Sequence, residues 1–165
     1  MDYKASLDTI AKVMTSGIFI LFAGIGLSSV NAIWHASGDK TTILIHGSVL
    51  VLFVAILLGS WLYAPQSYTL DTTSLTINRP VGKVIINRSS IQEVRLISDG
   101  EMKSTVRTFG NGGLFGYYGK YYNTTIGHMT WYLTQSKNRI LIVTNEGKKI
   151  VISPDDASLL DNLKR

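Results

Sequence analysis

Residues 107–123 read Arg107-Thr108-Phe109-Gly110-Asn111-Gly112-Gly113-Leu114-Phe115-Gly116-Tyr117-Tyr118-Gly119-Lys120-Tyr121-Tyr122-Asn123. They hold five of the chain's 15 glycines, four of its eight tyrosines and two of its five phenylalanines. Glycine permits backbone angles that other residues avoid, and aromatic rings supply contact area, to which each tyrosine adds a polar tip. We therefore expect an aromatic loop here that meets a membrane surface, a partner or the rest of its own domain.

The rest of the 165-residue chain is unevenly composed, because residues 13–63 hold most of its apolar content. The chain has no cysteine, which excludes disulfides, a thiol nucleophile and thiolate metal sites. Of its 16 Lys and Arg and 11 Asp and Glu, three of each precede Ala64, so 13 basic residues face 8 acidic ones from there on. This excess fits an anionic membrane face, a nucleic acid or an ordinary solvated surface. Of the two anionic partners we expect the membrane and not nucleic acid.

Two uncharged stretches of 21 residues, Val13–Ile33 and Ile43–Tyr63, predict membrane-spanning helices. Each exceeds the roughly 20 apolar residues that cross a bilayer core, and backbone groups in lipid must be bonded internally. The polar turn between them is short, so we expect an antiparallel transmembrane hairpin over residues 13–63. Trp34 at one end, and Trp61 and Tyr63 at the other, are typical interfacial anchors.

Basic residues around the spans predict the orientation of the hairpin. Lys4 and Lys12 precede the first span, and Arg79, Lys83 and Arg88 follow the second. The turn carries only Lys40 beside an aspartate. Positive flanks face the cytoplasm. We therefore expect a cytoplasmic segment over residues 1–12 and a cytoplasmic domain over residues 64–165.

Small residues on the two spans predict close helix packing, either within the hairpin or between copies. They are Gly17, Gly24, Ser28 and Asn31 in the first span and Gly47, Ala55 and Gly59 in the second. His46 lies three residues inside the second span, at a level comparable with Asn31. An ionisable group inside a membrane is a functional candidate, but at this depth we expect a neutral histidine with a local hydrogen bond.

The remainder of the chain predicts seven strands and one helix. Alternating or continuous apolar runs indicate strands at 67–70, 74–79, 83–87, 91–97, 127–135, 139–144 and 148–152. Residues 98–125 form a long connection that contains the aromatic loop. Ser153-Pro154-Asp155-Asp156 then predicts a helix start, with Ser153 as the cap. Ala157, Leu159, Leu160 and Leu163 give that helix an apolar stripe. We expect it to close one end of a small β-barrel or sandwich.

Four segments together resemble bacterial pleckstrin-homology (PH) domain proteins that carry an N-terminal membrane hairpin. They are Tyr63–Tyr68, Ile91–Val94, Arg107–Lys120 and Ser153–Asp156. The resemblance covers essentially the whole chain and implies two nearly orthogonal sheets of seven strands capped by a C-terminal helix. It also implies a bacterial cytoplasmic membrane location. The family has no assigned biochemical role that the resemblance carries over.

One feature of other PH domains is missing from this chain. Eukaryotic PH domains that bind phosphoinositides place Lys and Arg around the turn between their first two strands. Here that turn reads Asp71-Thr72-Thr73-Ser74. Phosphoinositide recognition is therefore not expected.

No residue pattern supports catalysis, a metal or a cofactor. The glycines of the aromatic loop match neither G-x-G-x-x-G nor a P-loop. His35, His46 and His128 fall in a turn, a span and the β-domain, and no pair of ligands has the spacing of a zinc site. We expect no enzyme activity, no metal and no cofactor.

Three interpretations of the aromatic loop remain open. As an interaction module it docks a protein partner or a second copy. As a lipid-binding surface it places tyrosines at headgroup depth, with Lys103, Arg107 and Lys120 on anionic lipid. As a structural lid it covers a sheet edge of its own domain. The interaction residues are Arg107, Phe109, Leu114, Phe115, Tyr117, Tyr118, Lys120, Tyr121 and Tyr122.

Overall fold

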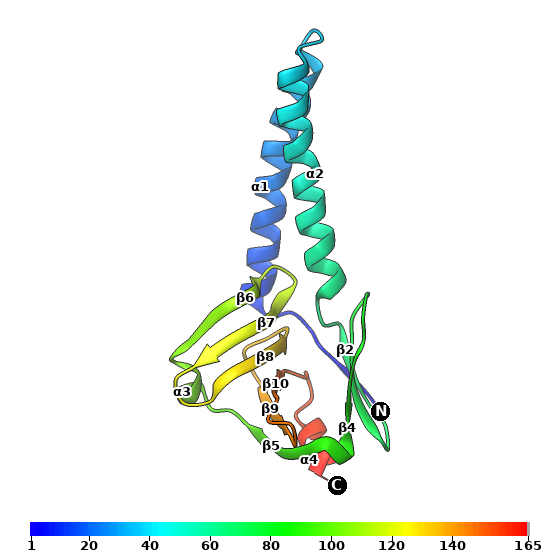
Figure 1. Ribbon diagram of the computed structural model, residues 1–165, viewed down its shortest axis with the longest axis vertical. Helices are drawn as coiled ribbons and strands as arrows, with labels where there is room; N and C mark the ends of the chain where they lie inside the picture. The colour runs from blue at the N-terminus through cyan, green and yellow to red at the C-terminus, as the bar shows by residue number, and fades with distance from the viewer. Residues whose placement is uncertain (165) are drawn as a thin grey trace.

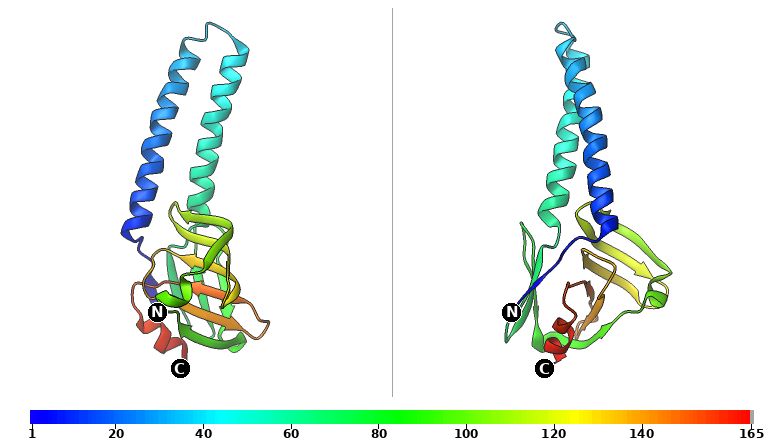
Figure 2. Two further views of the ribbon diagram at one scale, coloured as in Figure 1. Left: turned by 90° about the vertical axis from the view of Figure 1, so that its left-hand side faces the viewer. Right: turned by 180° about the vertical axis from the view of Figure 1, so that it is seen from behind.

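The two apolar stretches form the longest helices, α1 (Thr9–Trp34) and α2 (Lys40–Tyr63), in a computed structural model that describes residues 1–164. Each helix begins where an aspartate caps it, so both start before the predicted spans. The Asp8 carboxylate accepts a hydrogen bond from the Ala11 N–H at 2.8 Å, and that of Asp39 accepts from Thr41 and Thr42. Both helices are long and apolar enough to cross a membrane by length and composition. They stand on one end of the β-rich domain (Figures 1 and 2).

The helices pack against each other through larger side chains than predicted. Phe22 and Phe53 stack with ring centroids 4.0 Å apart, and His46 Nδ1 lies 3.3 Å from the Ser29 hydroxyl. The local hydrogen bond expected for His46 is therefore confirmed. A Cβ built at Gly17, Gly24, Gly47 or Gly59 meets nothing within 4 Å. The prediction that the two helices of one hairpin pack closely at these four glycines is therefore wrong. Packing of the glycines against the helices of a second copy stays a prediction.

The β-rich domain consists of two sheets. The first has the order β1-β2-β3-β4 and the second the order β5-β9-β10-β8-β7-β6. The strands are β1 (Asp2–Lys4), β2 (Ser67–Leu70), β3 (Ser74–Asn78), β4 (Val84–Asn87), β5 (Ile91–Leu96), β6 (Thr105–Gly113), β7 (Gly116–Asn123), β8 (Gly127–Leu133), β9 (Ile140–Thr144) and β10 (Lys149–Ile152). A 3₁₀ turn, η1 (Arg88–Ser90), joins the sheets, and α3 (Asp99–Met102) and α4 (Ser158–Lys164) complete the domain. The predicted fold class is confirmed as two apolar helices, a β-rich domain and a C-terminal helix, and β1, β6 and β7 are present in addition to the seven predicted strands.

Residues 98–125 do not form the irregular connection that their composition predicted. After α3 they form the hairpin β6–β7, so the aromatic loop is mostly strand. Gly110 and Gly119 pair across this hairpin, with φ angles of +115° and +124°. A Cβ at Gly110 would lie 2.3 Å from the Tyr118 carbonyl oxygen. These two glycines therefore allow two strands to approach closely.

The N-terminal segment, predicted to be separate, is built into the β-domain. β1 pairs antiparallel with β2 at the edge of the first sheet. The Asp155 carboxylate accepts hydrogen bonds from the Ser6 N–H at 2.9 Å and the Ser6 hydroxyl at 2.6 Å. Asp8 accepts from the Ser136 N–H at 3.1 Å. Both ends of the helical hairpin are consequently joined to the same domain.

The C-terminal helix begins five residues later than the predicted cap. Ser153 is fully buried and belongs to the core instead, because its hydroxyl accepts from the Thr134 N–H at 3.0 Å and its N–H donates to the Tyr68 hydroxyl at 3.2 Å. The Asp156 carboxylate accepts a hydrogen bond from the N–H of Ser158, the first residue of α4, at 2.9 Å. Leu159 and Leu163 are buried as predicted, whereas Ala157 is exposed.

The core lies on both faces of the six-stranded sheet. Ile140 and Ile142 join a cluster with the four-stranded sheet and α4, and Leu141 joins a second cluster with Trp131 and Tyr121. The alternation of these β9 residues follows from the two-residue period of a strand.

Candidate functional site

The tip of the β6–β7 hairpin contacts the first turns of α1. The Thr15 hydroxyl donates to the Gly113 carbonyl at 3.3 Å and accepts from the Phe115 N–H at 3.0 Å. The Phe115 ring meets the edge of Phe19 at a centroid distance of 6.0 Å. The Tyr117 hydroxyl donates to the Asp8 carboxylate at 3.2 Å. The hairpin thus connects the β-domain to α1 (Figure 1).

Tyr118 connects the same hairpin to α2. Its hydroxyl donates to the carbonyl oxygen of Ser60, in the last turn of α2, and accepts from the Asn111 side-chain amide at 2.9 Å. Burial raises the pKa of Tyr118 above its ordinary value. The phenol therefore keeps its proton at neutral pH and remains a donor.

Two further tyrosines of the hairpin have different surroundings. Tyr121 lies in the core cluster that contains Trp131, and Tyr117 contacts the Asp8 carboxylate at the start of α1. Tyr121 stacks on Trp131 at 3.8 Å, and its hydroxyl donates to the Asn111 carbonyl at 2.6 Å. Burial raises the pKa of Tyr121 to about 12. Burial, followed by the nearby Asp8 carboxylate, raises the pKa of Tyr117 to about 12. Both hydroxyls are therefore neutral hydrogen-bond donors.

The nine predicted interaction residues differ in burial, which depends on the face of the hairpin that each occupies and on contacts with the helices. Leu114, Tyr118 and Tyr121 are buried, and Phe115 and Tyr117 are half-buried. Arg107, Phe109, Lys120 and Tyr122 are exposed, with Phe109 at 78%. The exposed members are the part of the hairpin that is available to a partner.

A groove of about 540 Å³ lies where the last turn of α2 meets the sheet. We call it the junction groove. It is lined by Gly59, Ser60, Tyr63, Arg79, Phe109, Gly110, Asn111, Tyr118, Gly119, Lys120, Thr130 and Tyr132. Rings and glycine backbone form most of its walls, and its charged members are Arg79 and Lys120.

Arg79 is held in the groove by two aromatic rings. Its guanidinium carbon lies 5.7 Å from the ring centre of Tyr63 and 5.6 Å from that of Tyr132. Its Nε donates to the Gly82 carbonyl at 2.7 Å. The turn that carries Arg79 is in turn attached to α2, because the Val81 N–H donates to the Leu62 carbonyl at 3.0 Å. Arg79 is therefore positioned beside the helix end.

Sequence reasoning placed Lys120 and Phe109 in a binding site but missed Arg79, Tyr63 and Tyr132 as their neighbours. Thr130 and Tyr132 alternate with the buried Met129 and Trp131 along β8, so their shared face was readable from the strand period. The pairing of β7 with β8 was not readable, because residues 98–125 gave no strand pattern. Arg79 reaches the groove only through the fold.

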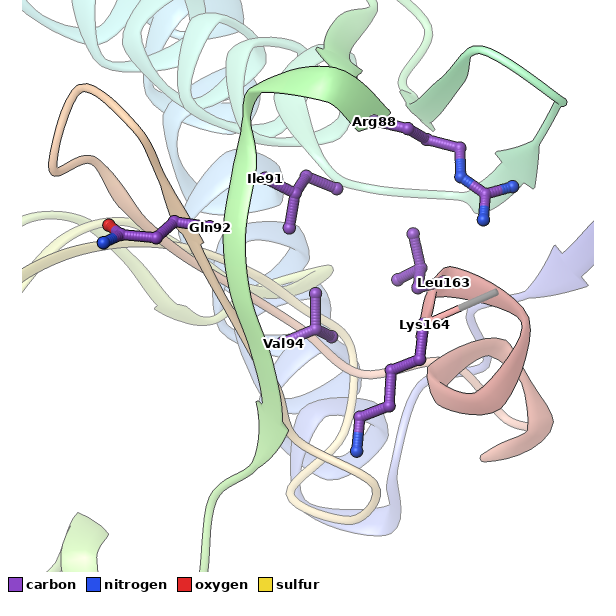
Figure 3. A pocket seen from close by; sticks show the side chains of 6 residues that line it. All are labelled: Arg88, Ile91, Gln92, Val94, Leu163 and Lys164. Carbon is purple, nitrogen blue, oxygen red and sulfur yellow. The ribbon is translucent and has the colours of Figure 1, made fainter.

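A second hollow, of about 360 Å³, lies between β5 and α4 (Figure 3). Ile91 and Val94 point towards α4, and Gln92 points to the other side of β5. Arg88 donates to the Asn162 carbonyl at 3.0 Å. In Figure 1, β5 and α4 lie at the end of the domain opposite the helices α1 and α2, so the hollow that they line is remote from the junction groove.

None of the three histidines lines the junction groove or the hollow between β5 and α4. His35 Nδ1 is 2.9 Å from the Asn31 carbonyl at the turn of the helical hairpin, and the ring of His128 is 4.9 Å from that of Tyr122. Across residues 1–164, no three His, Cys, Asp or Glu side chains gather as a metal site would require.

Comparison with known proteins identifies the β-rich domain. No curated protein and no solved structure matches the chain. The family model described as a bacterial PH domain matches residues 66–165. That range covers β2 to β10 and α4, and thus the whole six-stranded sheet, the strands β2 to β4 of the other sheet and the C-terminal helix. The chain therefore belongs to the bacterial PH domain family.

Proposed function

We propose that this protein is an integral membrane interaction module whose PH domain lies on the cytoplasmic face and associates with a second copy through the edge strand β6. Both helices would cross the membrane. At a rise of about 1.5 Å per residue, the 26 residues of α1 and 24 of α2 span roughly 39 and 36 Å, against about 30 Å for a bilayer core.

The distribution of charge at the two ends of the helices supports this orientation. Lys12, Arg79 and Lys83 lie at the base, where the helices meet the β-domain, whereas the turn at the far end has Lys40 beside Asp39. An excess of cations at the base favours the cytoplasmic side. In bacteria the membrane would be the cytoplasmic one.

The exposed edge of β6 carries the proposal of self-association. β6 pairs with β7 on one side only, and Val106 and Phe109 on it are 63% and 78% exposed. Tyr122, opposite Val106 on β7, is 40% exposed. A nine-residue strand with an unpaired edge and apolar side chains is a template for pairing with another chain. We call Val106, Phe109 and Tyr122 the β6 strip.

The absence of cysteine permits a direct test of this contact. A single Val106→Cys variant in membranes is expected to form a disulfide-linked dimer on mild oxidation. Ile85→Cys is the matched control, because Ile85 is 64% exposed, close to the 63% of Val106, and lies on an edge strand of the other sheet. Equal crosslinking of both variants would indicate random collision, and no crosslinking at Val106 would contradict self-association through β6.

A second measurement tests the energy of the contact. Phe109→Ser removes the most exposed ring of the β6 strip and is expected to weaken dimerisation in detergent by roughly tenfold or more, as for the loss of an aromatic anchor. Ile85→Ser should leave the dimer unchanged. Analytical ultracentrifugation of both variants gives the comparison.

We assign the protein no catalytic role.

A further inference from the structure

We infer that the junction groove binds the phosphate-bearing headgroup of an anionic phospholipid from the leaflet that adjoins the PH domain. The inference rests on the proposed membrane insertion but not on self-association. The lipid phosphate would lie between Arg79 and Lys120, and its acyl chains would lie along α2.

The depth of the groove favours a lipid. Gly59, Ser60 and Tyr63 belong to the last turn and a half of α2, at the end of its apolar stretch. Trp61 and Tyr63 are about half exposed there, and such rings occupy the headgroup level of a bilayer. Space beside Gly59 is open, since a Cβ there would meet nothing within 4 Å. An acyl chain can therefore pass along the helix into the groove.

The charge of the groove favours an anion. Arg79 and Lys120 line it, and no carboxylate does. The Lys120 ammonium donates to the Thr130 hydroxyl at 2.9 Å, which leaves two of its protons free. Within residues 1–164 neither cation has a carboxylate within ion-pair distance. A guanidinium and an ammonium together suit a phosphate group.

The walls of the groove distinguish a lipid from a soluble phosphate. Phe109, Tyr63 and Tyr132 present apolar surface next to the two cations. A free phosphate ion would gain nothing from these rings, whereas the glycerol backbone and the first methylenes of a lipid would be buried against them. The Asp71–Thr73 turn at the other end of β2 takes no part in this site.

The test uses full-length protein in phosphatidylcholine nanodiscs that each hold one copy, so that self-association is excluded. Electron paramagnetic resonance of spin-labelled phosphatidylglycerol, relative to spin-labelled phosphatidylcholine, measures the preference for the anionic lipid. We expect the unaltered protein to prefer phosphatidylglycerol. Each basic group near anionic lipid contributes about 1 kcal/mol, or about fivefold in affinity. The relative affinity for phosphatidylglycerol should therefore fall about fivefold for Lys120→Gln and roughly 25-fold for Arg79→Gln/Lys120→Gln.

A charge-matched control separates this site from general attraction. Lys137→Gln/Lys164→Gln removes the same two charges from exposed residues outside the groove and should change the preference by less than twofold. An equal loss in this control would overturn the inference, as would the absence of any preference in the unaltered protein. Lys120 is exposed, so the single variant tests the site even if the Arg79 variant does not fold.

Competition with free phosphate distinguishes a lipid site from a site for a soluble anion. Displacement of phosphatidylglycerol by millimolar inorganic phosphate, but not by the same ionic strength of chloride, would show a site for soluble phosphate and overturn the lipid assignment. Failure of the protein to enter nanodiscs would contradict the proposed membrane insertion itself. A preference in single-copy discs combined with no Val106→Cys dimer would retain the lipid site and reject self-association.

Discussion

Gly110 on β6 and Gly119 on β7 face each other so closely that neither position has room for a side chain. A Cβ at Gly110 would lie 2.3 Å from the Tyr118 carbonyl oxygen, and one at Gly119 would lie 2.4 Å from the Phe109 carbonyl oxygen. Both residues also have positive φ angles. The pair brings the two strands together below the helices and positions Phe109 and Lys120, which are neighbours in the register.

Replacement of Gly110 by alanine is therefore expected to destabilise the β-domain by more than the cost of the positive φ angle alone. Positive φ costs about 1 kcal/mol for alanine, and the clash with the Tyr118 carbonyl should raise the total to roughly 3 kcal/mol. Gly147→Ala is the control, because Gly147 has a φ of +75° but open space around it. Thermal unfolding in detergent should show a larger loss for Gly110→Ala, and equal losses would contradict the close approach.

Asp8 and Tyr117 are expected to be energetically coupled. The Asp8 carboxylate caps α1 and accepts from the Tyr117 hydroxyl at 3.2 Å and the Ser136 N–H at 3.1 Å. Asp8→Ala should lower the free energy of unfolding by about 2 kcal/mol through the lost cap and hydrogen bonds.

A double-mutant cycle tests that coupling. Asp8→Ala with Tyr117→Phe should give a coupling energy of about 1 kcal/mol. The same cycle with Tyr122→Phe should give none, since the hydroxyl of Tyr122 forms no hydrogen bond within residues 1–164 and its side chain is part of the exposed β6 strip. Additive effects of Asp8→Ala and Tyr117→Phe would show that the contact does not connect α1 to the domain.

Stability at alkaline pH is expected to depend on Tyr68. Burial raises the pKa of Tyr68 to about 12, whereas an unfolded tyrosine titrates near pH 10. The folded state therefore retains a proton that the unfolded state loses. The contribution of this group is complete below pH 10 and declines between pH 10 and 12, by up to roughly 3 kcal/mol.

Tyr68→Phe separates this titration from other alkaline effects. The variant loses the hydrogen bonds to the Tyr132 carbonyl and from the Ser153 N–H, so it should be less stable at pH 8. Its decline between pH 10 and 12 should be shallower than that of the unaltered protein. Unfolding curves across this range, with phenolate absorbance as a second readout, provide the measurement. Parallel declines would contradict the assignment.

The orientation of the helices is testable with single cysteines. Ser37→Cys places a thiol in the turn between α1 and α2, and Glu146→Cys places one in the turn between β9 and β10. Both positions are exposed. In intact cells a membrane-impermeant maleimide should label Ser37→Cys, and should label Glu146→Cys only after permeabilisation. The opposite pattern would invert the proposed topology, and labelling of both would contradict membrane crossing.

The sequence by itself determined the helical hairpin, the fold class and the family. Uninterrupted apolar stretches leave a long helix few alternatives, and short alternating strands with a terminal amphipathic helix indicate a capped β-fold. These signals are local, since each depends on residues that are neighbours in the chain.

Only the tertiary structure decided how the aromatic segment folds and what it packs against. Gly110 and Gly119 resemble loop residues until their pairing across β6 and β7 is known, because close approach of two strands is a property of their register. The local sequence predicted Ser153 as a helix cap, but in the folded domain its hydroxyl accepts a hydrogen bond from the N–H of Thr134, which directly follows β8. Arg79 and Lys120 are far apart in the sequence and line one groove. Contacts between distant segments depend on the packing of the whole domain, and no local pattern encodes them.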